Sequence, residues 1–168
     1  MKDTELYQHL LGLASPWHVA RVELDVKARR VRVFAEHAED GRFNCPECGA
    51  VCPLHDHDEE RSWRHLDSCQ FETHLVARVP RVRCDTHGTR QASVPWSQPR
   101  SRFTLLFERF AIDVLSATDV LNASKILGIS WDQAHHIMER AVERGLACRS
   151  LDSVEHIGVD EKSIAKRH

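Results

Sequence analysis

The chain has 168 residues, 42% of them hydrophobic and 29% charged, and its formal net charge is -2 with histidine neutral. This composition excludes general disorder, and the length allows one ordinary domain or two small ones, of which two small units are expected. No run approaches the roughly 18 apolar residues of a membrane span, and the acidic N-terminus lacks the apolar centre of a signal peptide. A cytoplasmic protein without a membrane partner is therefore predicted.

Arginine is concentrated in two segments, residues 29–32 and 78–102, whereas acidic residues gather at 56–60. A basic face is therefore compatible with a nearly neutral chain. The same pattern also describes arginines that solvate the outer side of a strand, and charge alone does not choose between the two.

The first half of the chain has the alternating pattern of strands. Two short strands are predicted between Pro16 and His37, and two more at 61–66 and 71–83. The acidic, histidine-rich segment 55–60 is expected to be a loop. A β-rich unit over 1–93 is thus predicted, followed by a proline-containing linker over 94–101.

Six cysteines in a chain without an export signal favour metal binding over disulfides. Two close pairs stand out, Cys45 with Cys48 and Cys84 with His87, and each is followed by a glycine that suits a tight metal-binding turn. Four such ligands fill a zinc tetrahedron and leave no open position, so the predicted Zn²⁺ is structural. A hairpin within 61–83 would bring the two pairs together.

Other assignments of these residues stay open. The neighbouring side chains that compete as ligands are Cys52, His55, His57 and Cys69. Some thiols could also be buried free cysteines, which are common in protein cores. A redox role for Cys45 and Cys48 is disfavoured, because no helix N-terminus follows to lower the thiol pKa.

From Phe103 onward apolar residues recur at helical spacing. A long helix to about Leu115 is predicted, then a second over 119–127 and a third from Ser130 to about Arg144. Ser130 and Gln133 form a capping-box pattern, and Gly128 permits the sharp turn of a helix-turn-helix over 102–150. The fold class is therefore α+β, with a small β-rich zinc-binding domain, a three-helix helix-turn-helix domain and a short C-terminal strand at 154–159.

The helical unit favours a DNA-binding role. The residues expected to face inward are Ala123, Ile126, Leu127, Ala134, Ile137, Met138 and Ala141. The residues expected to contact DNA are Arg81, Arg83, Arg100, Arg102, Trp131, Gln133, His135, His136, Arg140 and Arg144. Glutamine can pair with adenine edges and arginine with guanine or phosphate. Asp132 and Glu139 oppose this role because acids repel phosphates, and the alternative is a zinc-stabilised protein-interaction module.

Several stretches match a known family in detail. They are Cys45-Pro46-Glu47-Cys48-Gly49, Arg64-His65-Leu66-Asp67, Cys69-Gln70-Phe71-Glu72, residues 79–84, 94–96 and 102–107, and residues 156–163 around Asp160. In these stretches and in their order, the chain from about Phe43 to His168 resembles the ISL-three family of insertion-sequence transposases.

The resemblance implies an N-terminal zinc finger, a helix-turn-helix and then a nuclease domain of the RNase H type with an Asp-Asp-Glu metal triad. Cys45, Cys48, Cys84 and His87 match the finger's ligands. Asp160 matches the first triad carboxylate, and residues 151–168 match the start of the nuclease domain. The implied partner is DNA at the element's terminal inverted repeats, with a second copy or an intact transposase as further partners.

The chain ends eight residues after Asp160, so the other two triad acids are absent. No transposase activity is expected from this chain alone, and Mg²⁺ is expected only in full-length members of the family. A truncated reading frame, a fragment of a split gene and a domesticated DNA binder all remain open.

Overall fold

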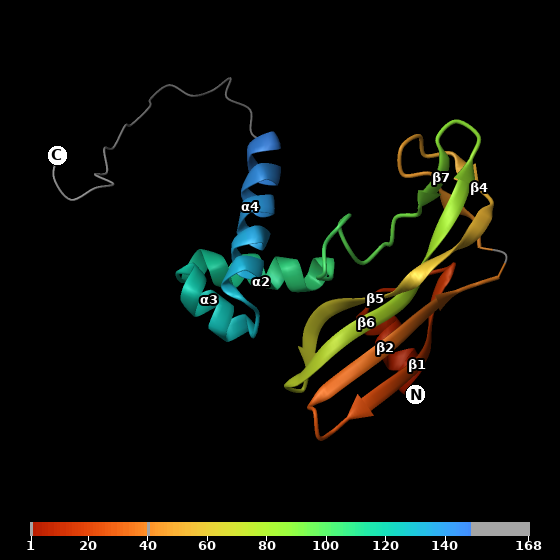
Figure 1. The fold of residues 1–168 in the computed structure, drawn as a ribbon. Coiled ribbons are helices and arrows are strands. Elements are labelled where there is room, and N and C mark those ends of the chain that lie inside the picture. The colour runs from red at the N-terminus through yellow and green to blue at the C-terminus, as the bar shows by residue number, and fades with distance from the viewer. Residues whose placement is uncertain (1, 40, 149–168) are drawn as a thin grey trace, which may run out of the picture. The chain divides into compact units, whose positions relative to one another are not determined.

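The computed structural model describes residues 2–39 and 41–148 (Figure 1). Contacts divide the chain into two units, residues 1–117 and 118–168. This division falls later than the linker predicted at 94–101. The strand predicted at 154–159 lies outside the described residues. None of the described helices is long and apolar enough to cross a membrane.

The first unit combines a helix, a sheet and a second helix. Its elements are α1 (Asp3–Leu10), β1 (Trp17–Asp25), β2 (Arg30–His37), β3 (Phe43–Asn44), β4 (Val51–Cys52), β5 (Leu54–Ser68), β6 (Phe71–Cys84), β7 (Gly88–Gln91) and α2 (Leu105–Ala117). The described part of the second unit contains α3 (Val120–Leu127) and α4 (Trp131–Ala147). The α+β class is confirmed, although α1 adds a helix that was not predicted.

Strand β6 organises the sheet, whose order is β1-β2-β6-β5 with β7 also paired to β6. One half of β6 runs parallel to β2, with Arg30–Phe34 opposite Glu72–Val76. The other half pairs with β7 up to Cys84. The short strands β3 and β4 form a separate two-stranded sheet. The same strand thus carries the chain from the centre of the core to the second cysteine pair.

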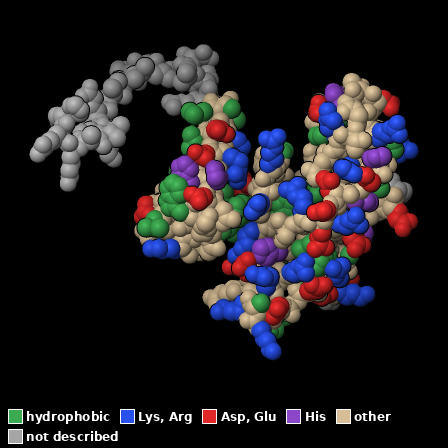
Figure 2. Space-filling model, in the orientation of Figure 1, with side chains coloured by type: hydrophobic (Ala, Val, Ile, Leu, Met, Phe, Trp, Pro, Cys, Tyr) green, Lys and Arg blue, Asp and Glu red, His purple; other side chains and the backbone are tan. Residues whose placement is uncertain are grey.

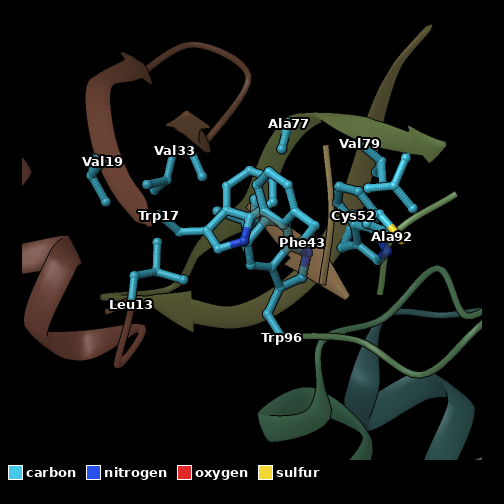
Figure 3. Close-up of a cluster of buried hydrophobic side chains, with 14 of the residues drawn as sticks. Leu13, Trp17, Val19, Val33, Phe43, Cys52, Ala77, Val79, Ala92 and Trp96 are labelled. Atoms are coloured by element: carbon cyan, nitrogen blue, oxygen red, sulfur yellow. The ribbon is translucent and has the colours of Figure 1, made fainter. Parts of the chain in front are cut away.

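The core lies on one face of this sheet and is rich in aromatic rings (Figure 3). The ring centroids of Trp17 and Trp96 are 4.7 Å apart, and those of Trp63 and Trp96 are 5.5 Å apart. Phe43 packs on Trp17 at 5.9 Å. These contacts join β1, β5, the segment before α2, and β3, which directly precedes the first cysteine pair. We refer to Trp17, Phe43, Trp63 and Trp96 as the aromatic cluster.

The hairpin predicted over 16–37 is confirmed as β1 and β2. Helix α1, absent from the prediction, is held against β1 by Gln8, whose Oε1 accepts a hydrogen bond of 2.6 Å from the backbone N–H of Val19. An eight-residue helix with no buried side chain depends on such contacts more than on its own propensity. A local pattern therefore did not reveal it.

The loop predicted at 55–60 is wrong, because β5 already begins at Leu54. Asp56 lies opposite Arg81 and Glu60 opposite Arg78. This part of β5 lies at the edge of the sheet, where acidic side chains stay in solvent and face arginines of the next strand. This segment is therefore a strand because it pairs with β6. The prediction relied on an alternating apolar pattern, which the segment lacks.

The start of α2 is attached to β5. The Arg64 N–H donates to the Arg102 carbonyl at 2.8 Å, and the Thr104 N–H donates to the Arg64 carbonyl at 3.0 Å. Buried His65 lies with its Nδ1 2.9 Å from Thr104 Oγ1. Burial, and then the Arg64 charge, lower the pKa of His65 to about 4. These contacts place α2 in the first unit.

The second unit confirms the predicted turn. Gly128 ends α3 in the left-handed region at φ 63°, and the capping box of Ser130 and Gln133 begins α4. The most deeply buried residues of the two helices are Ala123, Ser124, Leu127, Ala134 and Ile137. Ile126 was predicted to face inward but is 65% exposed. It lies roughly 80° around the helix from the middle of the buried side of α3, which Ala123 and Leu127 define.

Candidate metal centre

Two turns of the first unit bring four ligand atoms together. Cys45 follows β3 and Cys48 lies in the turn after it, whereas Cys84 ends β6 and His87 lies in the turn between β6 and β7. All four ligand atoms lie within 4.8 Å of one another. In the described part of the chain this is the one cluster of three or more Cys, His, Asp or Glu side chains with that geometry. The predicted ligand set is thus assembled in space.

The spacing of these atoms fits zinc. The Sγ atoms of Cys48 and Cys84 are 3.7 Å apart, and His87 Nδ1 lies 3.7 Å from Cys45 Sγ and 3.6 Å from Cys84 Sγ. A tetrahedral ion with Zn–S of about 2.3 Å and Zn–N of about 2.1 Å requires edges of about 3.8 Å between sulfurs and about 3.6 Å between sulfur and nitrogen. These three distances agree with the tetrahedral values to about 0.1 Å, so the four side chains are grouped as the ligands of one ion require.

Backbone amides prepare two of the thiols for metal binding. The N–H groups of Cys48 and Glu47 lower the pKa of Cys45, and those of His87 and Thr86 lower the pKa of Cys84 to about 7. The thiolate is the metal-binding form of cysteine. Gly49 and Gly88, at φ 72° and 69°, follow the second ligand of each pair and let each turn close there. Each turn thus favours the thiolate at one of its cysteines. At Cys48 the Ala50 N–H acts in the same direction, but burial and the neighbouring thiols outweigh it and raise the pKa.

The competing ligands lie elsewhere. Cys52 is buried nearby, but its Sγ contacts the Ala50 carbonyl at 3.3 Å, and burial, then Cys84, raise its pKa. Cys69 is exposed, in the turn between β5 and β6. His55 faces Asp56 at 3.9 Å. His57 Nε2 lies 2.7 Å from Nε2 of His37. None of the four belongs to the ligand cluster.

A carboxylate beside the cluster was not singled out in the sequence. Glu47 Oε2 lies 3.8 Å from His87 Nε2, and Glu47 Oε1 lies 2.5 Å from Nε of Arg90 on β7. The hydrogen bond from Arg90 lowers the pKa of Glu47. Residues 47 and 90 are far apart in the chain, so only the register of β7 on β6 reveals the pair.

The arginines predicted to contact DNA fall into two groups. Arg81 makes ion pairs with Asp56 and Asp58, so its charge is already compensated. Arg83, Arg100 and Arg102 are exposed, and their side chains make no ion pair within the described residues. Figure 2 shows acidic and basic side chains interspersed over the sheet unit, where further arginine–carboxylate pairs occur.

The side chains of α4 that were predicted to contact DNA differ in their accessibility. The side chain of exposed Trp131 stacks on His135 with ring centroids 4.7 Å apart. His135 and exposed His136 both face Glu139, at 3.4 and 4.0 Å. Gln133 is occupied in the capping box. Arg140 and Arg144 are half-buried and interact with other residues. Among the predicted contacts on α4, Trp131 and His136 are thus the most accessible.

Asp160 and the rest of the predicted nuclease segment lie outside the described residues.

Comparison with known proteins matches both parts of this arrangement. Residues 42–87 match the zinc-finger of transposase IS204/IS1001/IS1096/IS1165, which covers the whole ligand cluster. Residues 92–142 match the helix-turn-helix domain of transposase family ISL3, which includes α2, α3 and most of α4. No solved structure matches the chain.

Two curated relatives are similar over the full chain. Both are named transposase for insertion sequence element IS1557, from Mycobacterium tuberculosis strains CDC 1551 and H37Rv, and each is 26% identical over 174 residues. The alignment covers 100% of this chain but 39% of each relative. The zinc-finger match covers the ligand cluster, and the helix-turn-helix match follows it in the chain, so the two matches are consistent with the structure. Both family models therefore place the matched parts of this chain, a zinc finger followed by a helix-turn-helix, with the ISL3-family transposases.

Proposed function

We propose that this chain is a DNA-binding region of a transposase, built around one structural Zn²⁺ and a helix-turn-helix, and that its target is the terminal inverted repeats of an insertion sequence. The observation that carries the proposal is the family match over 92–142 on helices whose turn and caps have the expected geometry. The named activity of the curated relatives is consistent with it.

Zinc has a structural role in this proposal. Cys45, Cys48, Cys84 and His87 supply four protein ligands, so a bound ion would have no open position for a substrate. The ion would lock the two turns together and supply folding free energy. Elemental analysis of purified protein should give about one zinc per chain, and no zinc would contradict this part of the proposal.

The unpaired arginines before α2 are the best candidates for phosphate contacts. Arg100 and Arg102 are exposed and make no ion pair within the described residues, so DNA need not displace a carboxylate to reach them. Each phosphate contact contributes about -0.9 to the slope of log K against log salt concentration. Arg100→Gln and Arg102→Gln should each make that slope shallower by about 0.9.

The test is a gel-shift titration with inverted-repeat DNA and a scrambled duplex at several salt concentrations. Arg21→Gln is the matched control, because Arg21 is equally a surface arginine but already faces Glu23 at 3.1 Å. Tighter binding to the repeat, weakened by salt and by the two test variants more than by the control, would support the proposal. Unchanged mobility at low salt would contradict it.

One observation favours the second candidate, a protein-interaction module. The exposed side of α4 carries the acids Asp132, Glu139 and Glu143 beside exposed Trp131 and Val142. Such a surface repels phosphates and suits a protein partner. If the gel shift fails while zinc binds, this candidate becomes the better explanation.

A further inference from the structure

The His87 ring has one occupied nitrogen and one available nitrogen. Its Nδ1 faces the sulfurs of Cys45 and Cys84 at 3.7 and 3.6 Å, so this atom is the ligand in the cluster. A neutral imidazole that binds metal through Nδ1 carries its hydrogen on Nε2. That hydrogen needs an acceptor, and the acceptor fixes the orientation of the ring.

Glu47 is positioned to be this acceptor. Its Oε2 lies 3.8 Å from His87 Nε2, so a small side-chain movement brings it within hydrogen-bond distance, and its other oxygen is held by Arg90 at 2.5 Å. Glu47 belongs to the first cysteine turn, His87 to the second and Arg90 to β7. The three side chains therefore form a chain of contacts across the two halves of the metal centre.

We propose that Glu47 is a positioning residue of the metal centre, which orients His87 through Nε2 and is itself held by Arg90. The inference rests on the proposed zinc function and adds the group that prepares the single nitrogen ligand. A carboxylate behind a metal-bound histidine fixes its tautomer and makes it a stronger ligand, and loss of such a partner typically weakens metal affinity about 10-fold to 100-fold.

A simpler role for Glu47 would be to connect the two turns without any effect on His87. In that case Glu47 and Arg90 would hold the turns together, and His87 would bind zinc equally well without them. The two roles differ in what happens at Nε2, so the experiment must observe that atom as well as the affinity.

The test uses the full chain and the variants Glu47→Gln and Arg90→Gln. Matched controls are Glu59→Gln and Arg109→Gln, exposed residues whose side chains make no ion pair within the described residues. Zinc affinity is measured by competition with a chromophoric chelator. The Nε2–H of His87 is followed by nitrogen-edited NMR in the zinc-loaded protein, where Glu47 should protect it from exchange with water.

We expect about 10-fold weaker zinc binding and faster Nε2–H exchange in Glu47→Gln, a smaller effect in Arg90→Gln and none in the controls. The double variant should be little weaker than Glu47→Gln alone, because Arg90 acts through Glu47. Unchanged Nε2–H exchange in Glu47→Gln would overturn the inference, whether or not zinc affinity falls, and so would zinc affinity equal to that of the controls. If the unaltered chain binds no zinc, it is the proposed function that fails first.

Discussion

His65 shows how one buried side chain makes stability depend on pH. It is buried under the start of α2 beside Thr104, and its pKa falls from the ordinary 6.5 to about 4, mainly because burial disfavours the charged ring. The native state therefore stays neutral at this position while the unfolded chain takes up a proton below pH 6.5. This contribution to stability is fully present above that pH and is lost progressively between about pH 6.5 and 4.

Replacement of His65 by Asn should remove this pH dependence. Between pH 7.5 and 5.5 the unaltered protein should lose about 1.4 kcal/mol more unfolding free energy than His65→Asn, from the linkage of a single proton. Urea unfolding of the zinc-loaded proteins at both pH values measures the difference. His55→Asn, at an exposed position, should behave like the unaltered chain. Equal pH dependence in the unaltered protein and His65→Asn would show that His65 is not protected from protonation.

The metal ligands were predictable and their supporting residues were not. Cys45 and Cys48, like Cys84 and His87, lie three residues apart and are followed by glycine, so local spacing alone indicated the site. The contact of Glu47 with Arg90 depends on strand register, which local patterns do not encode.

At the scale of elements, two glycines of the second unit differ in backbone conformation. Gly128 ends α3 at φ 63°, where a side chain is strained although its Cβ would meet no neighbour. Gly145 lies within α4, and a Cβ there would also meet nothing. Conformation, not space, therefore decides the effect of alanine at each position.

Gly128→Ala should destabilise the protein by about 1 kcal/mol, because the left-handed conformation disfavours a Cβ. Gly145→Ala should stabilise it by up to about 1 kcal/mol, because alanine is the better helix former. Urea unfolding followed by helical circular dichroism compares the two. Effects of the same sign would contradict the assigned caps.

Elements marked by capping or turn residues in the sequence were predicted, whereas elements whose conformation depends on pairing with another strand were not. The capping box at Ser130 and the turn at Gly128 specified α3 and α4 directly. The polar start of β5 was missed because its strand conformation comes from pairing with β6, and Ile126 was misplaced because the apolar pattern of α3 is wider than its buried side.

At the scale of the whole sheet unit, two sources of stability meet along β6. One end of this strand pairs with β2 in the core, and the other ends at Cys84 in the metal centre. Strands β3 and β4 have only two residues each, too few to persist without support. Phe43 anchors this end to Trp17 in the aromatic cluster. We therefore expect the metal end to depend on bound zinc more than the core end does.

Removal of zinc should loosen the metal end first. After chelation, amides of 43–52 and 84–91 should exchange with solvent rapidly, while those joining Arg30–Phe34 to Glu72–Val76 should stay protected, since local opening follows the least supported segments. Hydrogen exchange followed by mass spectrometry on the full chain measures this, and added zinc should restore protection. Equal loss of protection at both ends would mean that the ion stabilises the whole sheet cooperatively, and that the aromatic cluster cannot hold the core alone.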